Sequence, residues 1–177
     1  EAKFQYRLPY GYESAGGLGP VEVASKPIRR AEVRVVSAGG VIVQCTETSG
    51  TGSFSFTLPK ATGNYTIQVN SRAFNSYLKA SVLKDPETNL FYALTKTVSS
   101  NADKNVGTLT ASATGNILGG AFNILDQILE ANDYLRAQVG TCPIAGCNDF
   151  TVAPKVPIYW KKGFNPGEYV DAGALSF

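Results

Sequence analysis

The sequence predicts a mainly β protein: a β-sandwich with one long amphipathic helix and a small C-terminal β/loop region. Three observations predict this fold. Short β-type runs recur about every 10 residues between Gly-rich turns. In one later segment, apolar residues recur at the spacing of a helix that buries one face. The 177 residues, 44% of them hydrophobic, suffice for one packed domain with a partial second layer.

The N-terminal stretch alternates between apolar and polar residues, which predicts a half-buried strand. Its apolar parity comprises Phe4, Tyr6, Leu8, Tyr10 and Tyr12. Pro9 cannot donate a ladder hydrogen bond, so it moves the second half of the stretch to an edge or a strand end. A Gly- and Pro-rich loop is expected at residues 14–27.

Further strands are expected between Gly-containing turns such as Gly39-Gly40 and 49–52. They cover residues 31–37, 41–47, 53–58, 64–70, 77–83, 91–98 and 106–112, with a last one at 155–160. Short strands at this spacing are typical of a sandwich.

The helix is expected at residues 121–139, where apolar residues form a stripe of helical period. Gly119-Gly120 precede it, and Gly140 stands where a left-handed cap belongs. Its length of about 28 Å lets it cover one face of a sandwich. We therefore expect a sandwich over residues 1–113, and the helix with a Cys loop and a strand region over 114–177.

Three runs in the first half resemble a carboxypeptidase-regulatory-like domain. They are residues 26–36, 48–56 and 65–69, in the order Pro-x-x-x-Ala-x-Val, Thr-x-x-x-Gly-x-Phe and Tyr-x-Ile. The resemblance implies a transthyretin-like, that is immunoglobulin-like, sandwich of a bacterial exported protein. In it, Gly52 would hold the left-handed position of the turn.

Residues 121–126 and 157–160 are similar to a segment of large secreted bacterial proteins that precedes an HExxH zinc protease domain. The resemblance stops before the catalytic motif, and this sequence contains no His. It therefore implies a non-catalytic leading region, either alone or in another use.

Composition excludes several functions. Without His the chain lacks the usual general base, the Ser-His and Cys-His nucleophile pairs and imidazole zinc sites, so we expect no enzyme, no metal site and no cofactor. A net charge of +2 without basic runs argues against nucleic acid, and no apolar run is long enough for membrane insertion. The chain begins at Glu1 and has no Met, which favours a mature secreted protein without its signal peptide.

Cys142 and Cys147 enclose a four-residue loop, and in an exported protein we expect a disulfide between them. Cys45 is then free. It shares the parity of Val41 and Val43, which predicts a core position; the alternatives are a bridge to one of the other two Cys or a link between subunits.

Asp126, Glu130 and Asp133 share one face of the predicted helix. That spacing can hold a cation or place two carboxylates for acid–base chemistry, but a solvated helix face is the simpler interpretation.

Aromatic residues gather near the two chain ends. The set comprises Phe4, Tyr6, Tyr10, Tyr12, Tyr159, Trp160 and Phe164. They predict either core packing or an adhesive surface, since Tyr and Trp are enriched in interfaces.

Two classes of function follow. The first is an extracellular structural protein that associates with itself, as a surface or filament subunit. The second is the protease leader region described above. A third possibility is a module that binds glycans or other cell-surface ligands through Tyr159 and Trp160.

Overall fold

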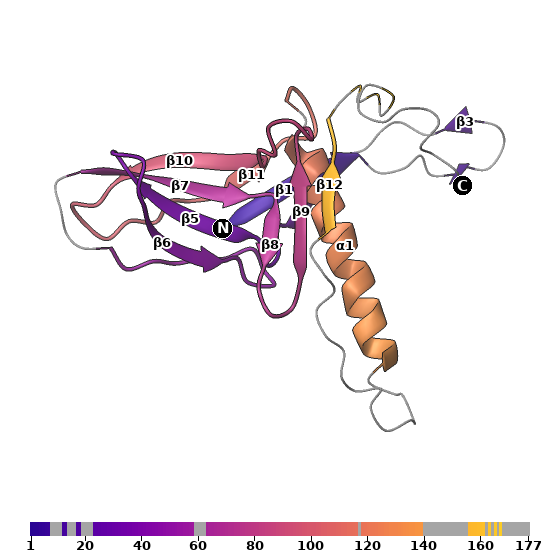
Figure 1. Cartoon of the computed structure of the whole chain (residues 1–177), viewed down its shortest axis with the longest axis horizontal. Coiled ribbons are helices and arrows are strands. Elements are labelled where there is room, and N and C mark those ends of the chain that lie inside the picture. Colours follow the sequence, from indigo (N-terminus) through magenta and orange to yellow (C-terminus); the bar gives the residue numbers. More distant parts are fainter. Residues whose placement is uncertain are drawn as a thin grey trace.

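The computed structural model describes residues 1–7, 12–13, 17–18, 23–58, 63–116, 118–139 and 156–161, with residues 163, 165 and 167. This part of the chain is mainly β, with one helix, as predicted. Figure 1 shows a four-stranded sheet to one side of the helix and the short strands β8 and β9 between them.

The four-stranded sheet has the order β10-β7-β5-β6 with all neighbours antiparallel. The strands are β10 (Ala93–Ser99), β7 (Asn64–Asn70), β5 (Glu32–Ser37) and β6 (Ile42–Glu47). Val33 lies opposite Val69 and Val35 opposite Ile67, and all four are buried. This alternation gives the sheet an apolar inner face, and the four predicted strands are confirmed to within two residues at each end.

A second sheet has the order β11-β1-β4. It contains β11 (Leu109–Ala111), β1 (Ala2–Arg7) and β4 (Val23–Pro27). The predicted N-terminal strand is confirmed, but β1 is central, parallel to β11 and antiparallel to β4. Phe4 is fully buried in the core, so its prediction as an interface residue is wrong.

Two further strand groups complete the β structure. β12 (Val156–Tyr159), β9 (Lys79–Leu83) and β8 (Arg72–Phe74) form a sheet in which β12 runs parallel to β9. β2 (Tyr12–Glu13) pairs with β3 (Gly17–Leu18) in a separate two-stranded sheet. β4 and β3 fall inside the predicted loop, so the prediction of loop throughout 14–27 is wrong.

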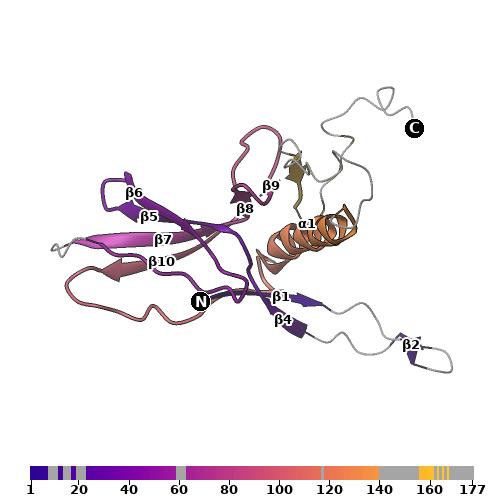
Figure 2. The ribbon, with the colours of Figure 1, turned by 90° about the horizontal axis from the view of Figure 1, so that it is seen from below.

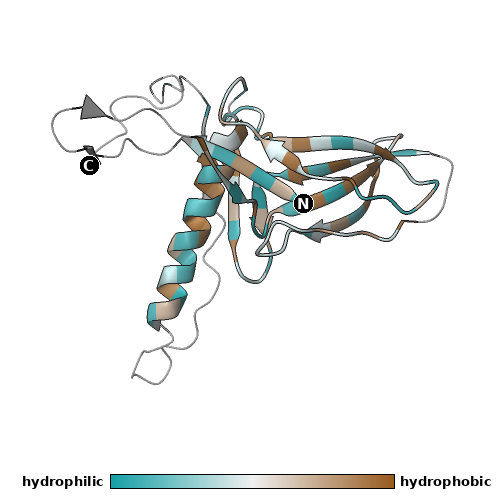
Figure 3. Cartoon of the chain, turned by 180° about the vertical axis from the view of Figure 1, so that it is seen from behind, coloured by the Kyte–Doolittle hydropathy of each residue, from teal (hydrophilic) through white to brown (hydrophobic). Residues whose placement is uncertain are grey.

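The helix α1 (Leu118–Val139) packs against β1 and β9, and Figure 2 shows β1 and β4 running along one side of it. Brown and teal residues alternate along it in Figure 3, which is the predicted amphipathic pattern. Its apolar side enters the core through Ala121, Phe122, Leu125 and Leu129. The predicted helix is confirmed and begins three residues earlier.

Residues 53–58 were expected as a strand but join no sheet. Their alternation packs Phe54 and Phe56 against the core from an extended segment without a ladder. Gly52 before them has a φ of 76°, and the Ala2 amide donates to the Gly52 carbonyl at 2.8 Å. A Cβ on Gly52 would lie 2.4 Å from the Ala2 carbonyl oxygen, so the predicted left-handed glycine is confirmed.

Candidate functional site

The outer edge of the four-stranded sheet carries the most exposed apolar cluster on a described strand. Val41, just before β6, is 64% exposed, and Ile42 and Val43 at the start of β6 are 48% and 47% exposed. The strand contains neither Lys, Arg nor Pro, the residues that natural edges use to block pairing. Its one irregularity is a bulge, where the register to β5 shifts between Val35 and Val36. This surface is the β6 edge, and we define it as residues 41–47.

Backbone hydrogen bonds fix which groups of the β6 edge are unpaired by β5. The Thr48 amide donates to the Ala31 carbonyl at 2.9 Å, and the Arg30 amide donates to the Thr48 carbonyl at 3.0 Å. Thr48 therefore points its backbone groups toward β5. Because these directions alternate along a strand, the backbone groups of Cys45 and Glu47 point outward.

Cys45 is exposed and free, so its predicted core position is wrong. Parity assigned Cys45 to the wrong face, and the bulge breaks the alternation that linked it to Val41 and Val43. The register sets Thr46 opposite the buried Val33, so Thr46 has the inward-facing parity and Cys45 the outward-facing one. The alternative of a link between subunits stays open, and Cys142 and Cys147 lie outside the described residues.

Open hollows flank the β6 edge on both sides. One lies between Cys45 and Glu47 on one wall and Phe74 and Asn75 on the other. The Asn75 side chain donates to the Glu47 carboxylate there at 2.6 Å. The other hollow lies between Thr46–Ser49 and the segment 53–55. Arg30 and Glu32 also line the first hollow, so it lies over the face of the sheet beside β6.

The opposite edge of the same sheet, β10, differs in chemistry. Thr95, Lys96 and Thr97 are exposed there. The Lys96 ammonium donates to the Val106 carbonyl, which ties the strand to the segment that follows it. A Lys on an edge strand disfavours addition of another strand, so β10 is a guarded edge.

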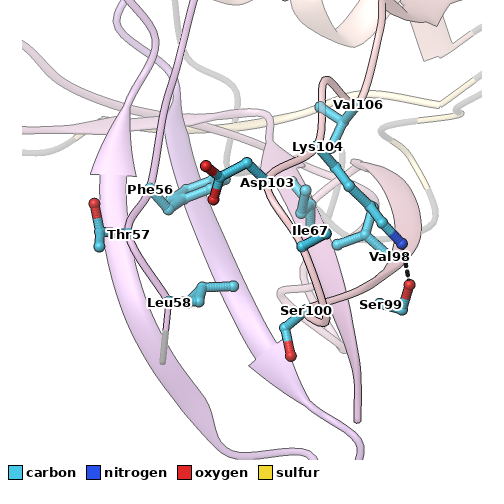
Figure 4. A pocket seen from close by; sticks show the side chains of 11 residues that line it. Phe56, Thr57, Leu58, Ile67, Val98, Ser99, Ser100, Asp103, Lys104 and Val106 are labelled. Atoms are coloured by element: carbon cyan, nitrogen blue, oxygen red, sulfur yellow. Dashed lines mark hydrogen bonds between the residues drawn. The ribbon is translucent and has the colours of Figure 1, made fainter. Parts of the chain in front are cut away.

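A cavity of about 360 Å³ lies near the end of β10, between the segment 56–58 and the segment 98–106. Figure 4 shows its lining side chains, with Ile67 among them. The apolar part consists of Phe56, Leu58, Ile67, Val98, Ala102 and Val106. Lys104 donates to the Ser99 hydroxyl beside it. The cavity offers an apolar hollow with charged groups around it, and nothing in its lining selects one ligand.

The three carboxylates of the helix contact cationic and hydroxyl side chains of the same chain. Arg29 contacts Asp126 at 2.6 Å, Lys26 contacts Glu130 at 3.0 Å, and the Tyr77 hydroxyl donates to Asp133 at 2.7 Å. Asp126 is 4% exposed, so the prediction of a solvated face is wrong for this residue. Its position four residues after Phe122, inside the apolar stripe, is the sequence signal that could have revealed this.

These contacts also set the acidity of the carboxylates. Burial raises the pKa of Asp126 above its ordinary value, against the opposing effect of Arg29. The hydrogen bond from Lys26 lowers the pKa of Glu130. The hydrogen bond to Asp133 raises the pKa of the Tyr77 hydroxyl. In the described part of the chain no group of three metal-ligating residues forms. The three carboxylates form a seam that ties α1 to Lys26 of β4, to Arg29 after it and to Tyr77 before β9.

Among the described residues, the aromatic side chains of the predicted interface do not gather on one surface. Trp160 packs on Tyr92 with ring centroids 5.7 Å apart, and Gly120 leaves the space for its indole. Tyr6 is half-buried against the core, and the Tyr159 hydroxyl donates to Asn89 at 2.8 Å. Tyr10, Phe164 and the side chain of Tyr12 lie outside the described residues. An exposed apolar cluster lies instead at 41–43, of which Val41 and Val43 were expected on the core-facing side of their strand.

The chain matches no family model, no curated protein and no solved structure. The resemblances to a regulatory-like domain and to a protease leader region therefore stay predictions. Within the described residues, no helix is long and apolar enough to cross a membrane.

Proposed function

We propose that the chain is a non-catalytic, extracellular structural protein, built on a transthyretin-like sandwich, that associates with further copies of itself through the β6 edge. The observation that supports this is the exposed cluster of Val41, Ile42 and Val43, at the beginning of an edge strand that contains neither Lys, Arg nor Pro. Burial of such side chains is favourable, and strand addition satisfies the outward backbone groups of Cys45 and Glu47 at the same time.

The chemistry of the described part supports a binding role over catalysis. Arg29 contacts the carboxylate of the buried Asp126. The Tyr77 hydroxyl, whose pKa is raised, donates to Asp133. Both groups serve the packing of α1 and have no neighbouring nucleophile to activate. The β6 edge, in contrast, offers surface without reactive pairs.

The test is sedimentation velocity of the full chain over a range of concentrations, with the variant Ile42→Lys. We expect the natural sequence to associate in a concentration-dependent manner, and Ile42→Lys to weaken association about tenfold or more, because it places an ammonium in the apolar part of the edge.

The matched control is Leu90→Lys, since Leu90 is 55% exposed and lies outside the β6 edge. It should associate as the natural sequence does. A natural sequence that sediments as a monomer at every concentration contradicts the proposal. Equal weakening by both variants also contradicts it, because the effect would then come from net charge and not from the edge.

A further inference from the structure

A group of cations stacked on aromatic rings lies next to β8, on the outer face of the four-stranded sheet. Arg34 of β5, which stands opposite the outward-facing Cys45, and Arg72 of β8 lie over the Phe91 ring, 5.8 and 5.3 Å from its centroid. Arg72 also lies 4.6 Å from the centroid of the Phe74 ring, and the Lys79 ammonium lies 5.7 Å from the same centroid. These contacts join residues of three strands and the segment before β10 into one cluster. We define the cation–aromatic cluster as Arg34, Arg72, Phe74, Lys79 and Phe91.

The cation–aromatic cluster carries more positive charge than its neighbours neutralise. Glu32 contacts both arginines: Nη1 of Arg72 lies 3.1 Å from one carboxylate oxygen, and Nε of Arg34 contacts the other. The Asn70 amide also donates to the Glu32 carboxylate, at 3.1 Å. Within the described ranges, no other carboxylate pairs with either arginine, and Lys79 forms no ion pair. Three cations thus share one carboxylate, and the cluster can neutralise further negative charge from outside the chain.

Stacking and partial burial hold the two arginines in place. Their side chains are 22% exposed for Arg34 and 18% exposed for Arg72, so each is held by its neighbours and still reaches water. A guanidinium has five N–H donors in a fixed plane, and Glu32 engages Nε of Arg34 and Nη1 of Arg72. A side chain that is already ordered loses little conformational freedom when it binds a ligand. The cluster is therefore suited to receive a second carboxylate beside that of Glu32.

Phe74 adds apolar surface to this positive charge. Its side chain is 51% exposed, which is unusual for Phe, and the ring also forms a wall of the hollow that contains Asn75 and Glu47. The Glu47 carboxylate lies 3.5 Å from Arg30, so this part of the hollow adds no net negative charge. Its oxygens can accept hydrogen bonds from hydroxyl groups. Apolar surface, hydroxyl-accepting oxygens and excess positive charge therefore lie side by side.

We propose that the cation–aromatic cluster binds an acidic polysaccharide through the carboxylates of its uronic acid residues. The C–H groups of a sugar ring pack on the exposed part of Phe74, and the carboxylate of that sugar contacts Arg72 and Lys79. Nucleic acid fits less well, since its binding needs a longer array of cations along the backbone. The site does not use the exposed cluster 41–43, so this inference is independent of the proposed self-association.

The test is isothermal titration calorimetry of the full chain with polygalacturonate at low salt, with neutral dextran as the matched polymer. We expect binding of polygalacturonate and none of dextran, and weaker binding at high salt because dissolved ions screen the charges. Lys79→Gln should lower the affinity about fivefold, and Phe74→Gln should lower it about tenfold, since each removes one exposed contact with the ligand.

Two control variants make the same changes outside the cation–aromatic cluster. Lys84→Gln removes an exposed Lys whose ammonium lies 5.8 Å from the centroid of the Tyr92 ring. Tyr134→Gln removes an aromatic ring that is 66% exposed on α1. Both variants should bind polygalacturonate as the natural sequence does. Circular dichroism checks that every variant is folded before it is titrated.

Each contrary result overturns a stated part of the inference. Absence of polygalacturonate binding overturns it as a whole and leaves the proposed self-association standing, because the titration does not depend on the β6 edge. Unchanged affinity in Lys79→Gln and Phe74→Gln overturns the location of the site. Equal losses in Lys79→Gln and Lys84→Gln overturn it too, because net charge alone would then govern binding. Equal affinity for a double-stranded DNA fragment overturns the choice of polysaccharide, and equal affinity for dextran overturns the role of the carboxylates.

Discussion

The helix-covered end of the molecule buries polar groups and gives them partners, whereas the β6 edge leaves apolar side chains exposed. At the helix end, Gly119 admits the Gln5 carbonyl, and the buried Asp126 is matched by Arg29. At the β6 edge, Ile42 and Val43 remain about half exposed. The proposed function therefore places association in a different part of the molecule from the contacts that stabilise the fold. Substitutions at the helix end should change unfolding and leave association intact, and substitutions at the edge should do the reverse.

Gly119→Ala should give the largest effect. A Cβ at this position would lie 2.0 Å from the Gln5 carbonyl oxygen and 3.0 Å from that of Ser112, so α1 must move away from β1. We expect a loss of about 3 kcal/mol in the free energy of unfolding, measured by chemical denaturation, because the clash is with backbone that has no alternative rotamer.

The matched control for this change is Gly63→Ala. No atom lies within 4 Å of a Cβ there, and the residue does not need a positive φ. Its stability should stay within about 0.5 kcal/mol of the natural sequence. Equal losses in the two variants would show that the close approach of α1 to β1 does not limit stability.

Arg29→Gln should give the next effect, by leaving the buried Asp126 without its closest cation. Arg29 contacts the Asp126 carboxylate at 2.6 Å, and Lys26 stands farther away at 3.7 Å. We expect a loss of about 2 kcal/mol at neutral pH, below the value for a fully buried pair because Arg29 still reaches water. Denaturation at pH 7 measures it.

The double variant Arg29→Gln, Asp126→Asn is the control, since it removes the uncompensated charge together with its partner. It should recover most of the lost stability. Association of both variants should match the natural sequence, because the seam lies away from the β6 edge. If the double variant is as unstable as Arg29→Gln, the loss comes from the packing of the Arg29 stem and not from charge.

Local sequence patterns correctly predicted the elements that periodicity and turns specify. The helix, β5, β6 and β7 were predictable because periodicity and Gly turns specify them locally. β4 was missed because its ladder with β1 is a tertiary contact, written in no local pattern. Residues 53–58 have strand alternation but join no sheet, so alternation alone produced a false strand.

The candidate site shows the same division between pattern and partner. Parity placed Cys45 on the inner face, yet only the register to β5 decides which face is inner, and the bulge breaks the alternation toward Val41. Asp126 was grouped with a solvated face because the cation that holds it, Arg29, lies 97 residues away in the sequence. Chemistry that depends on such distant neighbours cannot be read from a single helix.

Lys96→Val tests whether the two sheet edges differ through their guarding residue. The change removes the ammonium from β10 and its hydrogen bond to the Val106 carbonyl. We expect larger assemblies than those of the natural sequence, detectable by light scattering, since both edges then accept strands. Lys84→Val is the control: its Lys is exposed after β9, away from β10, and its association should be unchanged. Unchanged assembly size in Lys96→Val would mean that something other than this Lys closes the β10 edge.

The smallest effect concerns the acid response of the helix seam, where two carboxylates of α1 should titrate in opposite senses. The pKa of Asp126 is raised above 3.8 by burial, and the pKa of Glu130 is lowered below 4.5 by its hydrogen bond from Lys26. For Asp126, the folded state takes up its proton at higher pH than the unfolded chain does, so its ionisation costs stability at neutral pH and that cost is relieved as the pH falls through the folded pKa.

For Glu130, the contribution to stability is complete above the ordinary value of 4.5 and is lost as the pH falls through the lowered pKa. As its side chain is 43% exposed, the contribution stays below about 1 kcal/mol. Carboxyl NMR titration should therefore show Asp126 above its ordinary value and Glu130 below it. Between pH 7 and pH 4, the natural sequence should gain stability relative to Asp126→Asn. The stability advantage of the natural sequence over Glu130→Gln should decline only at the acid end of this pH range. An Asp126 that titrates below 3.8 would mean that Arg29 outweighs burial, and the helix end would then be stabilised by its charges and not merely tolerant of them.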